Sequence, residues 1–317
     1  MAEQTKIKTS IGGSALIEGI MMRGPKRTTV AVRMEDKSIY TEDIEFKGLA
    51  SKCKIFRLPF VRGIASLIDS MRLSMKCLML SADKAIEGAG DEEEPSKFEK
   101  WLMDKFGDKI YNVIMVFASI LGIALAIGLF FVFPTFLFNL IAKAAPVFQE
   151  GTLWRSVFEG ILKIVMFLCY VWICSRTPDM KRVFMYHGAE HKTIFCYENL
   201  EELTVENVRK YKRFHPRCGT SFMVIMLIVG IFIGLFITET NPLLRGIIKI
   251  LLLPVSCGIG YELIKICGKY DNAFTRIVAA PGLWAQRITT IEPDDSMIEI
   301  AIAAIKPVIP ENGEDRI

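Results

Sequence analysis

Residues Asn112 to Phe133 read NVIMVFASILGIALAIGLFFVF, a run that contains no charged side chain. About 20 apolar residues in an α-helix are enough to cross the roughly 30 Å of hydrocarbon in a lipid bilayer. The run therefore predicts a transmembrane helix. The composition agrees, because 51% of the 317 residues are hydrophobic, whereas soluble domains are about 45–50% apolar even when glycine is counted. We therefore place the chain among integral membrane proteins.

Three further segments are long and apolar enough to span a bilayer, namely Val157 to Cys174, Gly219 to Ile237 and Leu243 to Cys267. The last of them is the least purely apolar, because it carries four charged residues: Arg245, Lys249, Glu262 and Lys265. Together the segments predict a mainly α fold. We expect an integral membrane helical bundle of about four transmembrane helices with a small cytoplasmic α+β region.

Two details of the spans have alternatives. The apolar character continues after Pro134, so residues 134–146 either extend a kinked first helix or lie in the membrane interface, and we favour the interface. Glu262 is an ionisable residue in an apolar segment, and such residues often have a function. We favour a place near the cytoplasmic end of the span, where Glu262 pairs with Lys265 or Lys269.

Basic residues are shared unevenly among the connections between the spans. Residues 176–217 contain nine Lys or Arg, against two in the first outer connection and one in the other. Because cytoplasmic loops carry the excess of basic residues, we predict that the loop 176–218 is cytoplasmic. With four spans, both termini are then cytoplasmic as well. The first residues, MAEQTKIKTSIGG, show no signal peptide, so we expect the first internal span to direct insertion.

The segments outside the spans complete the predicted organisation. Residues 1–86 are expected to form a cytoplasmic α+β region, in which TTVAVRME and IYTEDIEF are two strands joined by a short turn. Residues 87–100 are an acidic linker, and residues 101–268 hold the spans and the loop. Residues 269–317 form a cytoplasmic C-terminal segment.

Two helices are predicted outside the spans. From Val61 to Ala82 the apolar residues share one side of a helix, which either lies in the membrane interface or packs on the strands. A shorter amphipathic helix is predicted from Met297 to Ile305, with its start within residues 292–296 (EPDDS), and the final ENGEDRI is expected to be a frayed tail. Gly12 and Gly13 are expected to mark a tight turn, because GGSALIEG lacks a phosphate-loop pattern.

The charge and the cysteines exclude other classes of protein. The formal net charge is only +4, and the basic residues lie in short clusters beside apolar runs. This pattern is typical of membrane orientation and argues against nucleic acid as a partner. The eight cysteines are scattered, with no spacing that indicates a disulfide framework. Cys196 is expected to be a small buried residue, although it is near enough in sequence to the histidines to replace a metal ligand.

All three histidines lie in the predicted cytoplasmic loop, within the strings YHGAEHKT and FHPRCGTSF. His187 and His191 are four residues apart, so in a helix they share one face and can hold one ion. His215 and Cys218 come later, just before the third predicted span. Imidazole and thiolate ligands suit Zn2+ better than Mg2+ or Ca2+. We therefore predict that these four residues bind zinc, the one cofactor that the sequence indicates.

Residues 187–191 also match H-x-x-E-H, the inverted zincin pattern, in which the glutamate is the general base. Glu190 is therefore the predicted catalytic residue. Three interpretations stay open at this point. In the first, three protein ligands leave an open catalytic site; in the second, four ligands close a structural site that staples the loop to the third span; in the third, the histidines bind no metal.

Several longer strings resemble a bacterial family of multi-span membrane proteins of unknown function that are described as predicted metal-dependent enzymes. The strings are IGGSALIEGIMMRGP, FRLPFVRGIASLIDSMRLSMKCL, YHGAEHKT, FHPRCGTSF and APGLWAQRITTIEPDD. The resemblance extends over nearly the whole chain, and it implies a location in the bacterial plasma membrane. It also implies a metal site on His187, Glu190, His191, His215 and Cys218, and no particular substrate.

Two functions from different classes fit these observations. The first is a membrane-bound zinc hydrolase, such as a peptidase or amidase at the cytoplasmic membrane face. The second is a non-catalytic scaffold or regulator, whose zinc is structural and whose partner is another membrane protein or anionic lipid. Both have the lipid bilayer as a partner. A transporter is disfavoured, because the sequence shows no inverted repeat.

Overall fold

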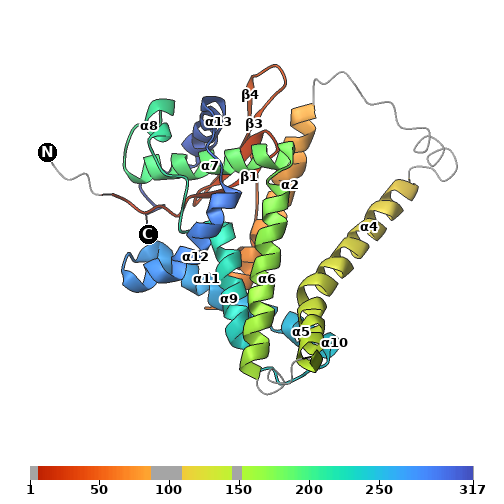
Figure 1. Ribbon diagram of the computed structural model, residues 1–317. Helices are drawn as coiled ribbons and strands as arrows, with labels where there is room; N and C mark the ends of the chain where they lie inside the picture. The colour runs from red at the N-terminus through yellow and green to blue at the C-terminus, as the bar shows by residue number, and fades with distance from the viewer. Residues whose placement is uncertain (1–5, 87–108, 145–151, 317) are drawn as a thin grey trace. The chain divides into compact units, whose positions relative to one another are not determined.

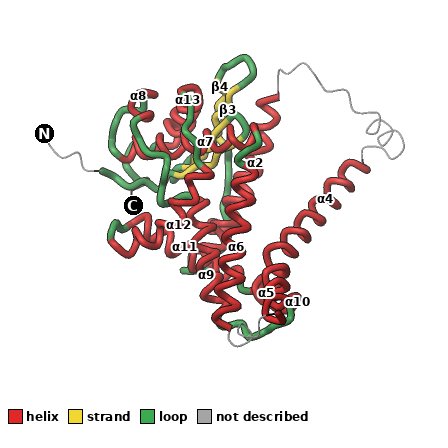
Figure 2. The backbone as a smooth tube through the Cα atoms, in the orientation of Figure 1, coloured by secondary structure: helices red, strands yellow, loops and turns green. Residues whose placement is uncertain are grey.

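A computed structural model describes residues 6–86, 109–144 and 152–316. These residues are mainly helical, with one small antiparallel sheet (Figure 1). Helices account for most of the backbone between the sheet and the C-terminus (Figure 2). The mainly α class with a small α+β region is therefore confirmed. The predicted acidic linker lies outside the described residues.

Two compact units make up the chain, and each is described by itself. Unit 1 is built from three stretches: Met1–Gly88, Met166–Val229 and Pro254–Ile317. Unit 2 is built from the two stretches between them: Ala89–Val165 and Gly230–Leu253. All the predicted zinc ligands belong to unit 1.

The sheet of unit 1 has four strands in chain order: β1 (Gly12–Leu16), β2 (Gly19–Arg23), β3 (Thr28–Arg33) and β4 (Ile39–Asp43). Neighbouring strands are antiparallel. β3 and β4 are the two predicted strands, whereas β1 and β2 are additional. The predicted turn at Gly12 and Gly13 is wrong, because both glycines lie inside β1 and pair with β2. The turn comes at Glu18, whose φ of 49° is left-handed.

Helices cover both faces of this sheet. They are α2 (Val61–Ile86), α7 (Pro178–Glu198) and α13 (Asp295–Ile305). Ile20 and Met22 of β2 pack in a core with α7 and α13. Met21, between them, packs with Leu73 of α2 in a second core, because successive side chains of a strand point to opposite faces. α2 therefore packs on the strands, and the sheet forms the middle of three layers.

The remaining described elements are helices or short helical turns. They are α1 (Leu49–Lys52), η1 (Lys54–Arg57), α4 (Lys109–Ile127), η2 (Gly128–Val132), α5 (Phe133–Ala144), α6 (Thr152–Cys174), α8 (Val205–Arg209), α9 (Gly219–Gly234), α10 (Pro242–Leu251), α11 (Leu253–Lys269), α12 (Ala273–Thr289) and η4 (Lys306–Val308). α12 is not among the predicted helices, and it contains Pro281, a residue that usually interrupts a helix.

The C-terminal segment is tied into unit 1. α13 begins where the sequence predicts, because the Asp294 side chain accepts a hydrogen bond from the main-chain N–H of Met297. The prediction of a frayed tail is wrong. Asp315 is fully buried and accepts a hydrogen bond from the Thr9 hydroxyl at 2.5 Å, and Arg316 forms an isolated bridge with Thr9. The N-terminal segment thus holds the tail in place.

Two helical runs are long and apolar enough to cross a membrane, Phe117–Ala144 and Leu153–Cys174. A third crossing results if α10 and α11, which are bent by 47° relative to each other, count as one broken span. α9 is apolar but has only 16 residues. The described part of the chain therefore carries two or three candidate spans.

The first candidate span continues past Pro134. α4, η2 and α5 follow one another as helix up to Ala144. The interfacial placement favoured for residues 134–146 is therefore not supported over residues 134–144, and the last two lie outside the described residues. The π-helical turn η2 ends at Val132, two positions before the proline, and such a local change of hydrogen bonding lets a helix accommodate a residue without an N–H group.

Glu262 of α11 pairs with a residue far away in sequence. The Nε of Arg62, at the start of α2, donates to the Glu262 carboxylate at 2.7 Å. The expected main partners, Lys265 and Lys269, are therefore wrong. The reason is tertiary, because α2 begins beside α11: a side chain added at Gly63 would meet the Tyr261 Cβ at 2.7 Å.

Candidate metal site

Helix α7 carries three of the predicted site residues. It begins with Pro178 at its first turn, a position that suits proline because no helical partner is lost there. It ends before Leu200, whose φ of 57° stops the helix. His187, Glu190 and His191 therefore lie on one face of α7, as their spacing predicts.

The structure brings three of the four predicted ligands together. One donor atom from each of His187, His191 and Cys218 lies within 4.8 Å of the others. Cys218 Sγ is 3.2 Å from His187 Nε2, and the two imidazole centroids are 4.4 Å apart. Cys218 directly precedes α9, and the main-chain N–H of Thr220 donates to its sulfur at 3.4 Å. A helix N-terminus of this kind favours the thiolate.

Main-chain carbonyl groups orient both histidine ligands. His187 Nδ1 lies 2.9 Å from the carbonyl oxygen of Thr289, and His191 Nδ1 lies 2.5 Å from that of Arg213. A carbonyl oxygen only accepts hydrogen bonds, so we assign the proton to Nδ1 in both rings. The Nε2 atoms are then the ones that would bind a metal once any proton on them is displaced, as is usual for histidine ligands held by a second group.

The three groups stabilise one another's charge. Burial alone raises the pKa of the Cys218 thiol, but the imidazoles of His187 and His191 outweigh burial and hold that pKa well below 9.0. Burial lowers the pKa of His187, yet the Cys218 sulfur and the Glu190 carboxylate raise it to about 9. The protein thus favours a thiolate beside a protonated imidazole. A divalent cation suits such a site, because metal binding displaces protons from these ligands.

Glu190 lies among the three ligands with half of its carboxylate unpaired. The main-chain N–H of Gly13 donates to this carboxylate. Its Oε2 atom is buried, and no hydrogen-bond partner lies near it among the described residues. Burial raises the pKa of Glu190, while His187 and His191 act in the opposite direction. An unpaired buried carboxylate oxygen is costly, so this atom together with two imidazoles and a thiolate fits a site for Zn2+.

Gly13 permits the close approach of strand β1 to Glu190. A Cβ atom at this position would lie 2.9 Å from the Glu190 Cδ and 2.6 Å from the main-chain oxygen of Met21. At the neighbouring Gly12, an added Cβ would meet nothing within 4 Å. The pair of glycines in the sequence thus has one member with a role at the site.

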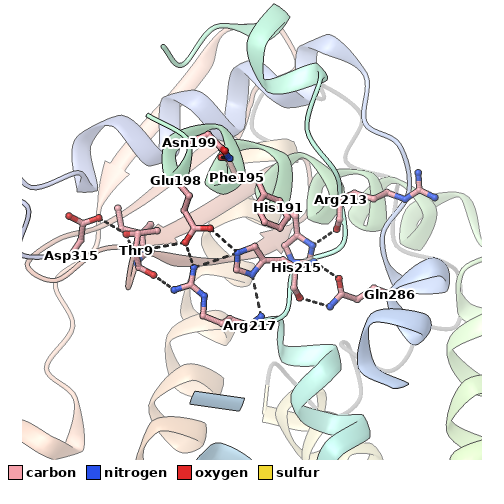
Figure 3. Close-up of polar contacts among 11 residues, drawn as sticks. Thr9, His191, Phe195, Glu198, Asn199, Arg213, His215, Arg217, Gln286 and Asp315 are labelled. Carbon is pink, nitrogen blue, oxygen red and sulfur yellow. Dashed lines mark hydrogen bonds and ion pairs between the residues drawn. The ribbon is translucent and has the colours of Figure 1, made fainter. Parts of the chain in front are cut away.

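The fourth predicted ligand, His215, faces a different partner (Figure 3). Its ring centroid is 5.6 Å from that of His191, but its Nε2 lies 3.7 Å from a carboxylate oxygen of Glu198. Its Nδ1 accepts the main-chain N–H of Arg217 at 3.3 Å, and burial lowers its pKa to about 4. Cys196 of α7 is also outside the group, because its side chain is buried in the core that α7 forms with the sheet and α13.

A polar network next to the ligands was not suggested by the sequence. Glu198 accepts from the Thr9 main-chain N–H at 3.0 Å and pairs with Arg217. Arg217 also donates to the Thr9 carbonyl, and Asp315 accepts from the Thr9 hydroxyl (Figure 3). Burial raises the pKa of Glu198, but its bonds to His215 and Arg217 outweigh burial and lower it. The network fixes both chain ends beside the segment that carries Cys218.

Gln286 of α12 holds the same segment from the other side. Its amide oxygen accepts the main-chain N–H of His215 at 2.7 Å, and its amide nitrogen donates to the His215 carbonyl at 2.7 Å and to Ser221 Oγ at 2.8 Å. One sequence signal could have found this contact. The small residues Ala279 and Gly282 precede Gln286 at helical spacing, and small residues on one side of a helix indicate close packing on the side that carries Gln286.

A cavity of about 590 Å³ lies beside the ligands. It is lined by His187, Glu190, His191 and Cys218, by residues 10–15 of the N-terminal segment and by serines of α2. Cavities of this size accommodate small molecules or short peptide segments. The ligand group is therefore covered by packed side chains on one side and borders the cavity on the other.

Fold and site together define a class of protein: a mainly helical chain with candidate membrane spans and a buried His–His–Cys group that can hold a metal ion. The chain belongs to a family of proteins of unknown function, DUF1385, whose profile matches residues 58–311. It is 34% identical over 306 residues to the uncharacterized protein YqhQ of Bacillus subtilis (strain 168), an alignment that covers 96% of this chain and 93% of the relative. No solved structure matches the chain.

Proposed function

We propose that this protein is a membrane-bound zinc hydrolase in which His187, His191 and Cys218 hold the metal and Glu190 is the general base. The observation that carries the proposal is the buried, unpaired Oε2 of Glu190 among three ligands at the edge of a cavity. Catalytic zinc sites have three protein ligands and an open position, whereas structural sites have four.

The donor set favours zinc over other divalent ions. Imidazole nitrogen and thiolate sulfur are poor ligands for Mg2+ or Ca2+ and good ones for Zn2+. When bound, zinc would supply the Lewis acidity that makes a water molecule acidic near neutral pH. The main-chain contacts of both Nδ1 atoms keep the two Nε2 atoms directed at the ion.

Glu190 has the properties of a proton acceptor. Burial raises its pKa, and a base with a raised pKa can both take up and release a proton near neutral pH. The main-chain N–H of Gly13 donates to the Glu190 carboxylate. This contact fixes the orientation of the carboxylate, including its unpaired oxygen. The cavity beside it leaves room for a substrate such as a peptide or an amide.

A structural site is the second candidate, and one observation favours it. The His215 ring lies close to that of His191, with centroids 5.6 Å apart. A rotation that exchanged Glu198 for the metal would complete a four-ligand site. In that case the zinc only fixes α7 to the start of α9, and the protein acts as a scaffold or regulator with another membrane protein or anionic lipid as partner.

The membrane arrangement is also a proposal. Four spans, with both termini and the ligand-bearing segment 176–218 in the cytoplasm of a bacterial cell, agree with the basic residues of that segment. Protease added outside spheroplasts should leave residues 176–218 intact, and cleavage there would reverse the orientation.

Cobalt substitution separates the open site from the closed one. Co2+ in place of zinc should show a sulfur-to-metal absorption band from Cys218, and acetohydroxamate should change the spectrum only if a coordination position is open. An unchanged spectrum would favour the structural site.

A matched test is Glu190→Gln, which keeps the size of the side chain but removes the base. The hydrolase should then retain zinc and lose cleavage of a peptide library by roughly 100-fold or more. Full activity of this variant would refute the role of Glu190.

A further inference from the structure

Helix α2 presents two different surfaces to the rest of unit 1. Leu73 and Cys77 are buried against the sheet. Next to them, three serines at helical spacing line the cavity beside the metal ligands: Ser66, Ser70 and Ser74. One helix therefore supports the sheet and forms a wall of the candidate site.

The third surface of α2 is apolar and exposed. It consists of Ile68, Met71, Met75, Leu78 and Met79, which we call the α2 stripe. Met71 is 65% exposed and Met79 63% exposed. At 100° per residue these side chains fall within an arc of about 100° around the helix, which is the width of a face that normally packs on something apolar. Exposed contiguous apolar surface of this kind indicates an interaction site.

The segment before α2 extends the same surface. Ile55, Leu58 and Phe60 are each more than half exposed. The charges around this surface are mostly positive, although exposed Asp83 lies one turn beyond Met79, and the exposed basic residues are Lys52, Lys54, Arg57, Arg72 and Lys76. Asp69 is the one acidic residue between positions 48 and 79, and it is buried and accepts the main-chain N–H of Leu49. The surface is therefore suited to a negatively charged partner with an apolar interior.

Contacts within unit 1 connect this surface to a candidate span. Phe60 packs against Gly258 of α11, where an added Cβ would lie 2.9 Å from the Phe60 main-chain oxygen. Arg62 pairs with Glu262 of the same helix. α11 is the second half of the bent candidate span. The start of α2 thus lies against a helix that is itself suited to a bilayer.

We propose that the α2 stripe and the segment 55–60 lie in the headgroup region of a bilayer leaflet rich in anionic phospholipid. The apolar side chains enter the boundary of the acyl chains, while the surrounding lysines and arginines contact phosphate groups. Ser66, Ser70 and Ser74 lie on the same helix, so one helix carries both the cavity wall and the proposed lipid contact. The contact does not depend on hydrolysis, so it goes beyond the proposed function.

Photo-crosslinking of the full chain in lipid nanodiscs tests this placement. The photoreactive residue p-benzoylphenylalanine replaces Met71 or Met75 in the stripe, and Glu35, which is exposed in the turn between β3 and β4, serves as the control position. We expect lipid adducts several-fold more abundant at Met71 and Met75 than at Glu35, by mass spectrometry. Adducts to a second copy of the chain alone, or lipid adducts no more abundant than at Glu35, would overturn the proposal. Only preparations that melt like the parent are compared, and two stripe positions guard against one that does not fold.

Charge reversal tests the anionic part of the proposal. In nanodiscs of phosphatidylcholine, the addition of phosphatidylglycerol should increase the adducts at Met75. Arg72→Glu combined with Lys76→Glu should abolish this increase. The matched control is Lys210→Glu with Lys212→Glu, two exposed positions outside the surface, which should leave it unchanged. An increase that persists in the Arg72/Lys76 variant would show that the basic residues do not select anionic lipid.

Discussion

Two clusters of buried charge, one in each unit, differ in whether the protein satisfies them itself. In unit 2, Arg245 is fully buried, and its Nε donates to both oxygens of Glu159 at 3.1 Å each. Its other nitrogens donate to Ser156 Oγ at 3.1 Å and to the Glu239 carbonyl at 3.1 Å. Lys249 pairs with the same Glu159 carboxylate. The hydrogen-bonding groups of Arg245 are thus satisfied by neighbours from α6 and from the segment that follows α9.

The cluster in unit 1 is incomplete in comparison. Glu190 keeps a buried oxygen without a described partner, and Cys218 and His187 oppose each other as thiolate and protonated imidazole. A buried cluster in which every donor and acceptor has a protein partner needs no ligand, so a structural role accounts for it. An unsaturated one implies a ligand that supplies the missing contacts. We therefore assign stability to Arg245 and metal binding to the histidines, and the predictions below test this division.

Loss of the metal is the largest expected effect. His187→Ala combined with His191→Ala removes two of three ligands, so the zinc content should fall from about one per chain to near zero. Elemental analysis of the detergent-purified protein measures this directly. If the parent protein is folded but stays free of metal after zinc is supplied, the assignment of metal binding to the histidines is wrong.

Removal of Arg245 should affect stability and leave the metal in place. Arg245→Leu leaves the Glu159 charge buried with Lys249 alone, and breaking a buried pair in this way costs about 3–5 kcal/mol. Thermal unfolding in detergent should show a lower melting temperature at unchanged zinc content. In the triple variant that adds Glu159→Leu and Lys249→Leu, much of the loss should be recovered, because no uncompensated buried charge remains. A parent-like melting temperature of Arg245→Leu would show that the cluster is not structural.

Local sequence pattern predicted those parts of the fold that depend on neighbours along the chain. The features of this kind are the apolar helix α6, strands β3 and β4, the start of α13 and the shared face of His187 and His191. The parts that were missed depend on contacts between distant segments. Arg62 meets Glu262 across 200 residues, and nothing local to either residue indicates the other.

The same limit applies to the site itself. Spacing placed His187, Glu190 and His191 on one helix face, and chemistry singled out Cys218 as a thiolate ligand. The orientation of the His215 ring depends on its contacts with Glu198 and Arg217. These contacts compete with metal binding, and the identities of the residues alone do not show which contact forms.

A smaller effect is expected at Gly13. In Gly13→Ala the added methyl group would overlap the Met21 carbonyl and the Glu190 side chain, so the strand or the glutamate must shift. We expect a loss of roughly 1–3 kcal/mol in stability and weaker hydrolysis at unchanged zinc content. Gly12→Ala is the matched control, because an added Cβ there meets nothing within 4 Å, and it should resemble the parent. Equal behaviour of the two variants would show that the approach of β1 to Glu190 is not needed.

The smallest effect is expected at His215, and it separates the open site from the closed one. As placed, His215 contacts Glu198 and not the ligand group, so His215→Gln should keep its zinc and lose at most about 10–100-fold in zinc affinity, as for a residue next to a ligand. Burial lowers the pKa of His215 from 6.5 to about 4. Between these pH values His215 binds a proton in the unfolded chain but not in the folded chain. The contribution of neutral His215 to stability is therefore present above pH 6.5 and is lost as the pH falls towards 4. The decline of the melting temperature over that interval should therefore be steeper for the parent than for His215→Gln. If His215→Gln instead loses zinc as completely as the variant without His187 and His191, the ring binds the metal in solution. The closed structural site would then replace the hydrolase, because no open position would remain.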